Sequence, residues 1–551
     1  MSQHELQTLR QPLMKEERDV FLDTDTDTDT APRHDFSSRS LRQVPERMLS
    51  TALSHARPAS LYKASKRFAY CFVPQIARSR YWNDHASKSK QFPTSYLNGL
   101  RGITSIKVFT FHWIMAFSDI GFAPWGTNDR HHYVLELPII RYFYAGFTAH
   151  VFFGIAGYLS SLRLFQLLDK RDQTSQAKVL LNVSGALFRR AFRLYLPVFI
   201  ITLITAHYIH FGFYEGNRGY ITDHGKLFPG VWNEPKPEKF ASYYRQMSYW
   251  AREMFDLTNI FTHGAVYPYH DQHLWSILAE LKGSIFLYLI LIGTAQCKKY
   301  VRLAGLCVMT VMFFLWNHWE IWVYIIGAVV AQIDLLLTER EQEKKLTLVP
   351  DRLPPSPPHS PKPDYKPPPT WSDYVSTPPK AGLRALRVLG FLLAFYLLSY
   401  PIDGSRDYAP GYMTLNKLIP AWMERKDKFY PNIGTGLLLL LLARADPDTS
   451  IWRRILNSSV PQYLGKISFA LYLVHGPIMH AVGYMIPHRI WWSMGVQGVD
   501  TTDLVWTGTM LIGWIITLSL SLWAADVWTR EVEGRCVKTV KKLEEWSFVK
   551  A

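Results

Sequence analysis

The sequence predicts an all-α integral membrane protein with about ten transmembrane helices, a disordered cytosolic N-terminal tail and a Pro-rich cytosolic loop. Apolar runs such as 287–293, 392–398 and 437–443 lie in windows that approach the length of a membrane span and hold few charges. Aromatic residues make up 15% of the chain, and many lie at the ends of these runs, as in interfacial belts. The Lys and Arg residues behind the net charge of +16 lie between the runs, which favours a topology signal over nucleic-acid binding.

The first 90 residues differ in character from the rest. They are polar and include the low-complexity run from Asp23 to Thr30 and scattered basic residues. No apolar signal-peptide core appears near Met1. We therefore expect residues 1–90 to form a disordered cytosolic tail.

Apolar segments of span character follow this tail. They cover residues 100–118, 143–165, 191–211, 274–294, 303–316, 319–337, 384–400, 430–443, 465–486 and 504–528. If the basic tail is cytosolic, every connection on the cytosolic side carries Lys or Arg, as the positive-inside rule requires. This distribution of Lys and Arg among the connections predicts a multi-pass protein with both termini in the cytosol. It leaves open which membrane holds the protein.

The connections divide the chain into parts. We expect one membrane-embedded body built from residues 95–337 and 384–530, with an aromatic-rich outward lobe at 212–272. Residues 338–383 form a cytosolic loop with a dense run of prolines, and residues 531–551 form a cytosolic C-terminal tail. The proline run favours an extended, solvated linker, which could serve as a plain tether or bind a partner with a Pro-binding groove.

The first span carries two ionisable residues in register. The segment 95–113 reads SYLNGLRGITSIKVFTFHW, with an Asn-Gly turn signal before Arg101 and the apolar run ending at His112. Eleven positions make about three helical turns, so both side chains fall on one face, roughly 16 Å apart along the axis. Ionisable residues inside a membrane indicate function. A snorkelling arginine and a hydrogen-bonded core histidine are the alternative.

The fourth span holds a carboxylate inside the bilayer. His273, Glu280 and Ser284 are seven and four residues apart and would share a helical face. A buried carboxylate needs a partner or a water-filled cavity, so we expect Glu280 to face the interior that holds Arg101 and His112. A packing role for Glu280 and an interfacial cap role for His273 stay open.

Two further motifs frame the same interior. Arg189, Arg190 and Arg193 lie at the cytosolic mouth of the third span, where they could bind phosphate or act only as a topology signal. In the ninth span, Ser468, Tyr472 and His475 share one face, and the Gly-Pro pair after His475 predicts a bend. HExxH, CxxC, Walker and GxSxG motifs are absent, so the sequence predicts no metal site and no nucleotide hydrolysis.

Taken together, these stretches resemble the membrane-bound acyltransferase-3 family, and most closely its fungal branch. The matching segments are YLNGLRG, the Arg101 and His112 pair, FFGIAGY, RRAFRLYLP, HLWSILAE and LGKISFALYLVHGP. The ordered set of segments is specific to the family, although each segment alone is weak evidence for it. The resemblance covers about 95–337 and 384–530.

This resemblance implies an acyl transfer, commonly of acetyl, from cytosolic acyl-CoA such as acetyl-CoA to a hydroxyl of a carbohydrate, lipid or small natural product. His112 would be the general base. Arginines at the cytosolic mouth would hold the CoA phosphates, namely Arg101, Arg189, Arg190 and Arg193. Glu280 and His475 could orient His112 or the acceptor, and the acceptor contacts would come from His273, Trp275, Tyr472 and His475. A covalent relay through Ser284 or Ser468 stays open.

Two other functions fit parts of the sequence. A transporter or flippase could use the same intramembrane residues as a proton relay, but would be expected to show internal repeats, and no convincing repeat is present. A scaffold or receptor would use the Pro-rich loop and leave Arg101, His112 and Glu280 without a role. We therefore expect an enzyme.

Overall fold

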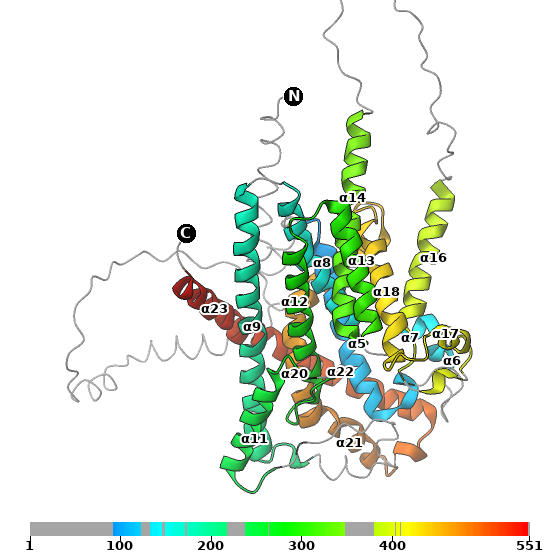
Figure 1. Cartoon of the computed structure of the whole chain (residues 1–551). Helices are drawn as coiled ribbons and strands as arrows, with labels where there is room; N and C mark the ends of the chain where they lie inside the picture. The colour runs from blue at the N-terminus through cyan, green and yellow to red at the C-terminus, as the bar shows by residue number, and fades with distance from the viewer. Residues whose placement is uncertain are drawn as a thin grey trace, which may run out of the picture.

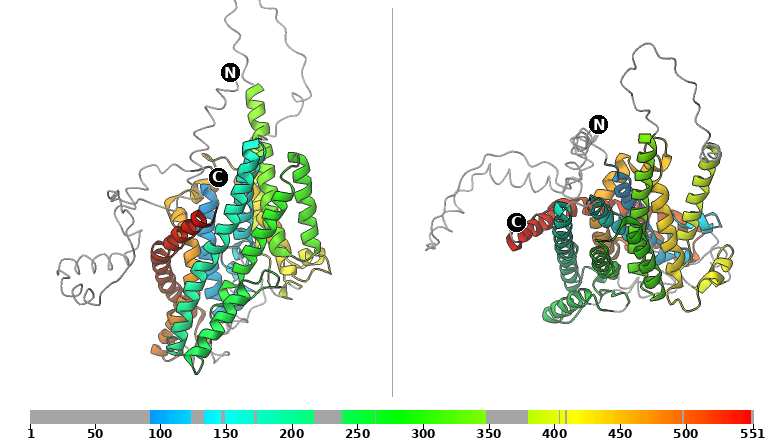
Figure 2. Two further views of the ribbon diagram at one scale, coloured as in Figure 1. Left: turned by 60° about the vertical axis from the view of Figure 1, so that its left-hand side comes forward. Right: turned by 45° about the horizontal axis from the view of Figure 1, so that its top comes forward.

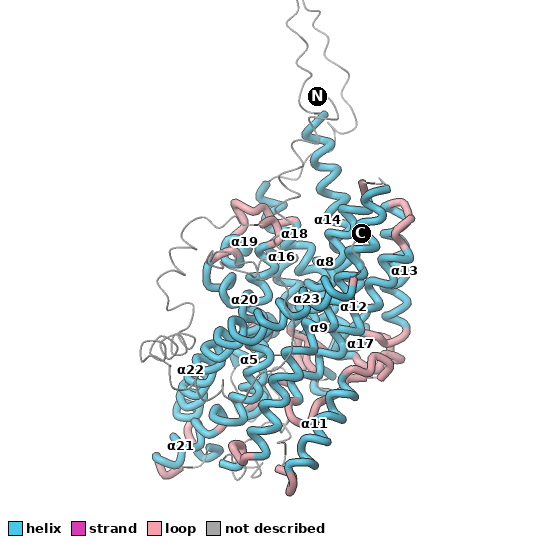
Figure 3. The backbone as a smooth tube through the Cα atoms, turned by 90° about the vertical axis from the view of Figure 1, so that its left-hand side faces the viewer, coloured by secondary structure: helices cyan, strands magenta, loops and turns pink. Residues whose placement is uncertain are grey.

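The structure is a computed structural model that describes most of the chain from residue 92 to residue 548. The described ranges are 92–122, 133–145, 149–170, 173–216, 237, 239–262, 264–347, 380–402, 404–407, 409–496 and 498–548. Every regular element in these ranges is a helix or helical turn, and none is a strand (Figure 3). The expected tail at 1–90 and most of the Pro-rich loop lie outside the described residues.

A helix is present at each of the expected spans. The long helices are α5 (Ser95–Phe117), α8 (Ala149–Leu168), α9 (Gln173–His210), α12 (Ser276–Gly293), α13 (Lys299–Leu315), α14 (Trp319–Thr347), α16 (Lys380–Leu398), α18 (Phe429–Ala443), α20 (Ser459–Ile478) and α22 (Asp503–Trp528). Shorter elements include α6 (Tyr133–Glu136), α7 (Pro138–Arg141), α11 (Tyr243–Leu257), α17 (Met413–Leu418), α19 (Ile451–Leu456), α21 (Met485–Ser493) and α23 (Gly534–Ser547).

The multi-pass character of the chain follows from these helices. Within the described ranges, 6 helical segments are long and apolar enough to cross a membrane: 149–168, 178–210, 272–293, 319–344, 459–493 and 503–547. Two of the remaining expected spans are short, because α13 has 17 residues and α18 has 15. The expectation of about ten spans thus stays a prediction, whereas the all-helical membrane fold is confirmed.

The long helices run side by side as a bundle with two distinct ends (Figures 1 and 2). The end of α14 and the beginning of α16, which flank the Pro-rich loop, extend from one end of the bundle. The short helices α11, α17 and α21 lie at the opposite end. Segments that the charge pattern assigns to opposite sides of the membrane are therefore separated in space.

Close contact between α8 and α14 forms the centre of the larger hydrophobic core. Gly157 of α8 lies against the backbone of α14, and a Cβ atom there would lie 2.1 Å from the carbonyl oxygen of Tyr324. Small residues permit such backbone approach between membrane helices. The small residues of the FFGIAGY segment (152–158) therefore serve the packing of α8 against its neighbouring helices.

We expect Gly157→Ala to lower the unfolding temperature of the detergent-purified protein, because its methyl group cannot fit without moving α14. Overpacking of this kind costs roughly 1–3 kcal/mol. Gly508→Ala in α22 is the matched control, since nothing lies within 4 Å of the added methyl group. Equal unfolding temperatures for the two variants would show that α8 and α14 can separate without cost.

One local prediction for the first span is wrong. Asn98 and Gly99 do not form a turn, because α5 already begins at Ser95. The glycine instead allows α5 to approach the end of α19, where a Cβ atom would lie 1.9 Å from the carbonyl oxygen of Leu456. The Asn98 amide donates to the backbone carbonyl and the side-chain oxygen of Gln462 on α20. The Asn-Gly pair therefore serves helix packing and not chain reversal.

Candidate active site

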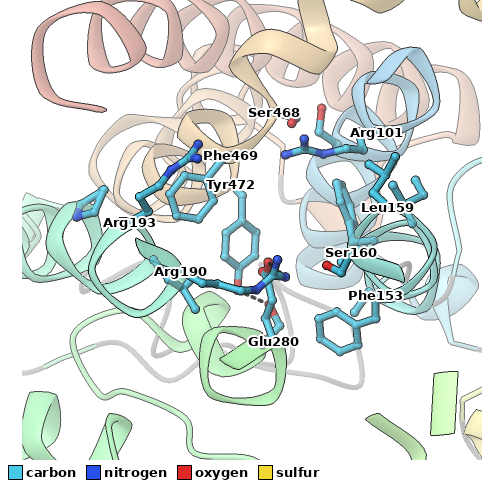
Figure 4. Close-up of a pocket in the computed structure, with 18 of the residues that line it drawn as sticks. Arg101, Phe153, Leu159, Ser160, Arg190, Arg193, Glu280, Ser468, Phe469 and Tyr472 are labelled. Atoms are coloured by element: carbon cyan, nitrogen blue, oxygen red, sulfur yellow. Dashed lines mark hydrogen bonds and ion pairs between the residues drawn. The ribbon is translucent and has the colours of Figure 1, made fainter. Parts of the chain in front are cut away.

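A cavity of about 340 Å³ opens inside the bundle and holds most of the expected site residues (Figure 4). Its wall comes from α5, α8, α9, α12 and α20, and from the turn η8 (Thr529–Glu533) with α23. The polar and ionisable residues of the wall include Arg101, Ser105, His112, Ser160, Arg163, Arg189, Arg190, Arg193, Ser276, Glu280, Ser468, Tyr472, His475 and Glu533. Arg101 and His112 of α5 therefore face one common space.

One part of the cavity is rich in arginine. Arg101, Arg190 and Arg193 approach the same space from α5 and α9 (Figure 4). Arg189 pairs with Glu544 of α23, and Glu533 interacts electrostatically with both Arg101 and Arg193. The whole wall holds five arginines and two glutamates, an excess of three positive charges. Such a site favours a ligand with several negative charges.

Glu280 lines the cavity but does not orient His112 in this structure. Its Oε1 atom accepts a hydrogen bond of 3.0 Å from Nη2 of Arg190, which also donates to the hydroxyl of Tyr324 at 3.0 Å. The prediction that Glu280 and His273 share a helical face is wrong, because His273 lies in the 3₁₀ turn η3 (Gln272–Trp275) before α12 begins. Glu280 thus holds an arginine of the cationic region.

Three buried histidines meet at the cavity, and two of them, His112 and His475, line its wall. His112 lies on α5, His273 on η3 and His475 on α20, with exposed fractions of 6%, 3% and 1%. Their ring centroids are 4.3 Å apart for His112 and His273, 5.3 Å for His112 and His475, and 4.7 Å for His273 and His475. The structure thus brings together three imidazole rings whose residues are far apart in the sequence.

Hydrogen bonds fix the orientation of two of these rings. The Nδ1 atom of His273 lies 2.8 Å from Oδ1 of Asp271, which also accepts from the backbone N–H of His273 at 3.2 Å. The Nδ1 atom of His475 lies 2.7 Å from the carbonyl oxygen of Tyr472 and 3.1 Å from that of Leu471. Because these oxygens accept, each ring carries a proton on Nδ1, and in the neutral imidazole the lone pair is then on Nε2.

The other expected acceptor residues lie beside this cluster. Trp275, Tyr472 and His475 line the cavity, whereas His273 lies behind its wall against His112. The Tyr472 hydroxyl donates to the carbonyl oxygen of His273, so the Ser276 hydroxyl, 2.8 Å away, donates to Tyr472. These bonds tie α20 to the beginning of α12. Ser284, a candidate for a covalent relay, instead donates to the Glu280 carbonyl.

Sequence reasoning missed several residues of the site. Asp271 is buried and contacts His273, but lies just outside the expected span. Arg163 and Ser276 also line the cavity. The expected C-terminal tail is largely helical, and Glu533, Cys536 and Val537 help close the cavity. The apolar spacing of Cys536, Val540 and Leu543 could have indicated this helix.

The regular α-helix ends shortly after His475, where the sequence predicts a bend. Pro477 lies near the end of α20, and the π-helical turn η6 (Met479–Gly483) follows directly. A Cβ atom on Gly476 would lie 2.5 Å from Nδ1 of His273 and 2.8 Å from Oδ1 of Asp271. Only glycine lets α20 approach the Asp271 and His273 pair this closely. The Gly-Pro pair therefore shapes the histidine cluster as well as the helix.

Comparison with known proteins points to a single family. The sequence model of an acyltransferase domain matches residues 94–525. The O-acetyltransferase PaAT-1 of Phomopsis amygdali is 26% identical over 80% of this chain and 83% of its own length. The acyltransferase clz18 of Cochliobolus lunatus is 26% identical over 82% and 95%, and the acyltransferase R4 of Phoma sp. is 25% identical over 83% and 97%. No solved structure matches the chain significantly.

Proposed function

The chain belongs to the acyltransferase family whose domain it matches, and we propose that it transfers an acyl group, typically acetyl, from cytosolic acyl-CoA to a hydroxyl of an acceptor. The acceptor would be a small natural product, a lipid or a carbohydrate. The observation that carries the proposal is a single cavity whose wall holds arginines and, about three turns of α5 from Arg101, the histidine His112. Membership of an enzyme family favours this function over transport.

The cationic region would bind the donor. The phosphates of CoA carry several negative charges, and arginine offers them paired N–H donors. Arg101, Arg190 and Arg193 are the cavity arginines that approach one common space, and Arg189 lies beside them. Glu280 would hold Arg190 in place for this contact. The thioester of the bound donor would then extend toward His112.

His112 would act as the general base on the acceptor. Its neutral imidazole takes the proton of the acceptor hydroxyl while the hydroxyl oxygen attacks the carbonyl carbon of the thioester. The C–O bond forms, the tetrahedral intermediate collapses and the C–S bond breaks. The leaving CoA thiolate takes the proton from the His112 imidazolium, which yields an ester, free CoA thiol and neutral His112. Proton and charge balance without a cofactor.

The side chains next to His112 would position the acceptor. Trp275 offers an apolar face, and Tyr472 and His475 offer polar contacts along the same wall. One relative is an O-acetyltransferase, which supports both the acetyl group and the oxygen acceptor. The buried pair of Asp271 and His273 would support the base from behind, since the His273 ring contacts the His112 ring.

A labelled-donor assay tests this function. Membranes with the wild-type chain receive radiolabelled acetyl-CoA and a cell extract, and the extractable products are separated by mass. We expect label in a hydroxylated product only when the chain is present, and the product mass then begins to identify the acceptor. Absence of transfer with every extract, together with ligand flux in reconstituted vesicles, would overturn the proposal in favour of a transporter.

A further inference from the structure

We propose that His112, His273 and His475 form a binding site for one divalent transition-metal ion of the Zn²⁺ type, and that occupation of this site stops acyl transfer. The ligand nitrogens of the three imidazoles all lie within 4.8 Å of one another. Tetrahedral zinc with Zn–N bonds of about 2.05 Å sets its nitrogens roughly 3.4 Å apart. Small rotations of the side chains would bring the three nitrogens to this spacing.

The surroundings of the histidines match those of metal ligands. A metal-bound histidine usually donates its other ring N–H to a carboxylate or a backbone carbonyl, which fixes the tautomer. Asp271 accepts this bond from His273, and the carbonyl oxygens of Leu471 and Tyr472 accept it from His475. Both Nε2 atoms then carry the lone pair that a metal requires.

Charge and rigidity also suit an ion. Three neutral imidazoles leave the two positive charges of the ion in place, and the buried Asp271 carboxylate beside His273 offsets one of them. The three rings come from α5, η3 and α20, and the close approach at Gly476 holds His273 and Asp271 against α20. His112 and His475 line the cavity, so an ion can enter through it and hold a fourth ligand there.

Metal binding and base catalysis exclude each other at His112. A nitrogen lone pair that is donated to a metal cannot accept the acceptor proton. The inhibitory part of this inference rests on the proposed function, whereas the binding part does not. The expected result is an enzyme that works without the ion and is reversibly stopped when the ion binds.

Cobalt(II) titration of the full-length protein in detergent tests the binding, because tetrahedral Co²⁺ absorbs in the visible range. We expect one ion per chain in the wild type and no saturable binding in His273→Ala or His475→Ala. Asp271→Asn keeps the three ligands and should weaken binding about 10–100-fold. His488→Gln is the matched control and should bind like the wild type, because His488 is buried but lies outside both the cluster and the cavity lining.

The transfer assay completes the test. Zn²⁺ should inhibit the wild type with an inhibition constant that matches the Kd for Zn²⁺ derived from its competition with Co²⁺, and a chelator should restore activity. Absence of saturable binding to the wild type, or undiminished binding to both alanine variants, would overturn the site. A requirement for the ion in transfer would overturn the inhibitory role and the assignment of His112 as base. Stoichiometric binding in a protein with no transferase activity would leave the site standing and reject only the proposed reaction.

Discussion

We expect His112→Gln to lower kcat for acyl transfer by about 10²–10⁴-fold, the contribution that a positioned general base makes. Glutamine keeps a polar side chain of similar reach but cannot take the acceptor proton. The KM for acyl-CoA should change little, because His112 lies about three turns of α5 from Arg101, one of the arginines that would bind the phosphates. Initial rates at varied donor concentration separate the two parameters.

The control for this variant is a second buried histidine. His488 of α21 is 3% exposed and lies outside the cavity, so His488→Gln should keep near wild-type turnover. Both variants should insert into membranes and purify like the wild type. Near-normal turnover of a well-expressed His112→Gln protein would remove His112 from the mechanism.

Arg101→Gln is expected to raise the KM for acetyl-CoA by about 10–100-fold, because a hydrogen bond to a charged group contributes about 1.5–3 kcal/mol. This increase in KM should occur only with donors that carry phosphate groups. A short thioester donor without phosphates, such as S-acetyl-N-acetylcysteamine, should therefore be used equally well by the wild type and the variant. Rates with the two donors, measured side by side, isolate the phosphate contact.

Arg535→Gln is the control for the arginine prediction. Arg535 is on α23 near the cavity, but it is exposed and pairs with Glu531 outside the lining. Its loss should leave the KM for both donors unchanged. An equal loss for Arg101→Gln with the phosphate-free donor would mean that Arg101 supports the fold of the cavity and does not bind the donor.

The helical architecture could be predicted because the signals are local. Apolar runs, interfacial aromatic residues and basic connections indicate each helix from its own residues, and a helix lies at every expected position. The common face of Arg101 and His112 could also be predicted, because both residues belong to α5 and are separated by about three helical turns. Predictions that depend on the residues of a single helix therefore agree with the structure.

Relations between distant segments could not be predicted in this way. No spacing rule places His112, His273 and His475 together, because their meeting depends on how α5, η3 and α20 pack. The sequence spacing places Glu280 on the helical face of His273. This prediction requires a regular helix that runs through His273. The 3₁₀ turn breaks that register, so Asp271 meets the histidines and Glu280 meets Arg190.

The most direct test of the account is the release of CoA thiol by the purified protein with acetyl-CoA and its identified acceptor, measured for wild type and His112→Gln under a chelator. We expect the wild type to release one CoA thiol for each ester formed, only when acceptor is present, and His112→Gln to release almost none. Acceptor-dependent release at wild-type rates by His112→Gln would contradict the account, because another group would then take the acceptor proton.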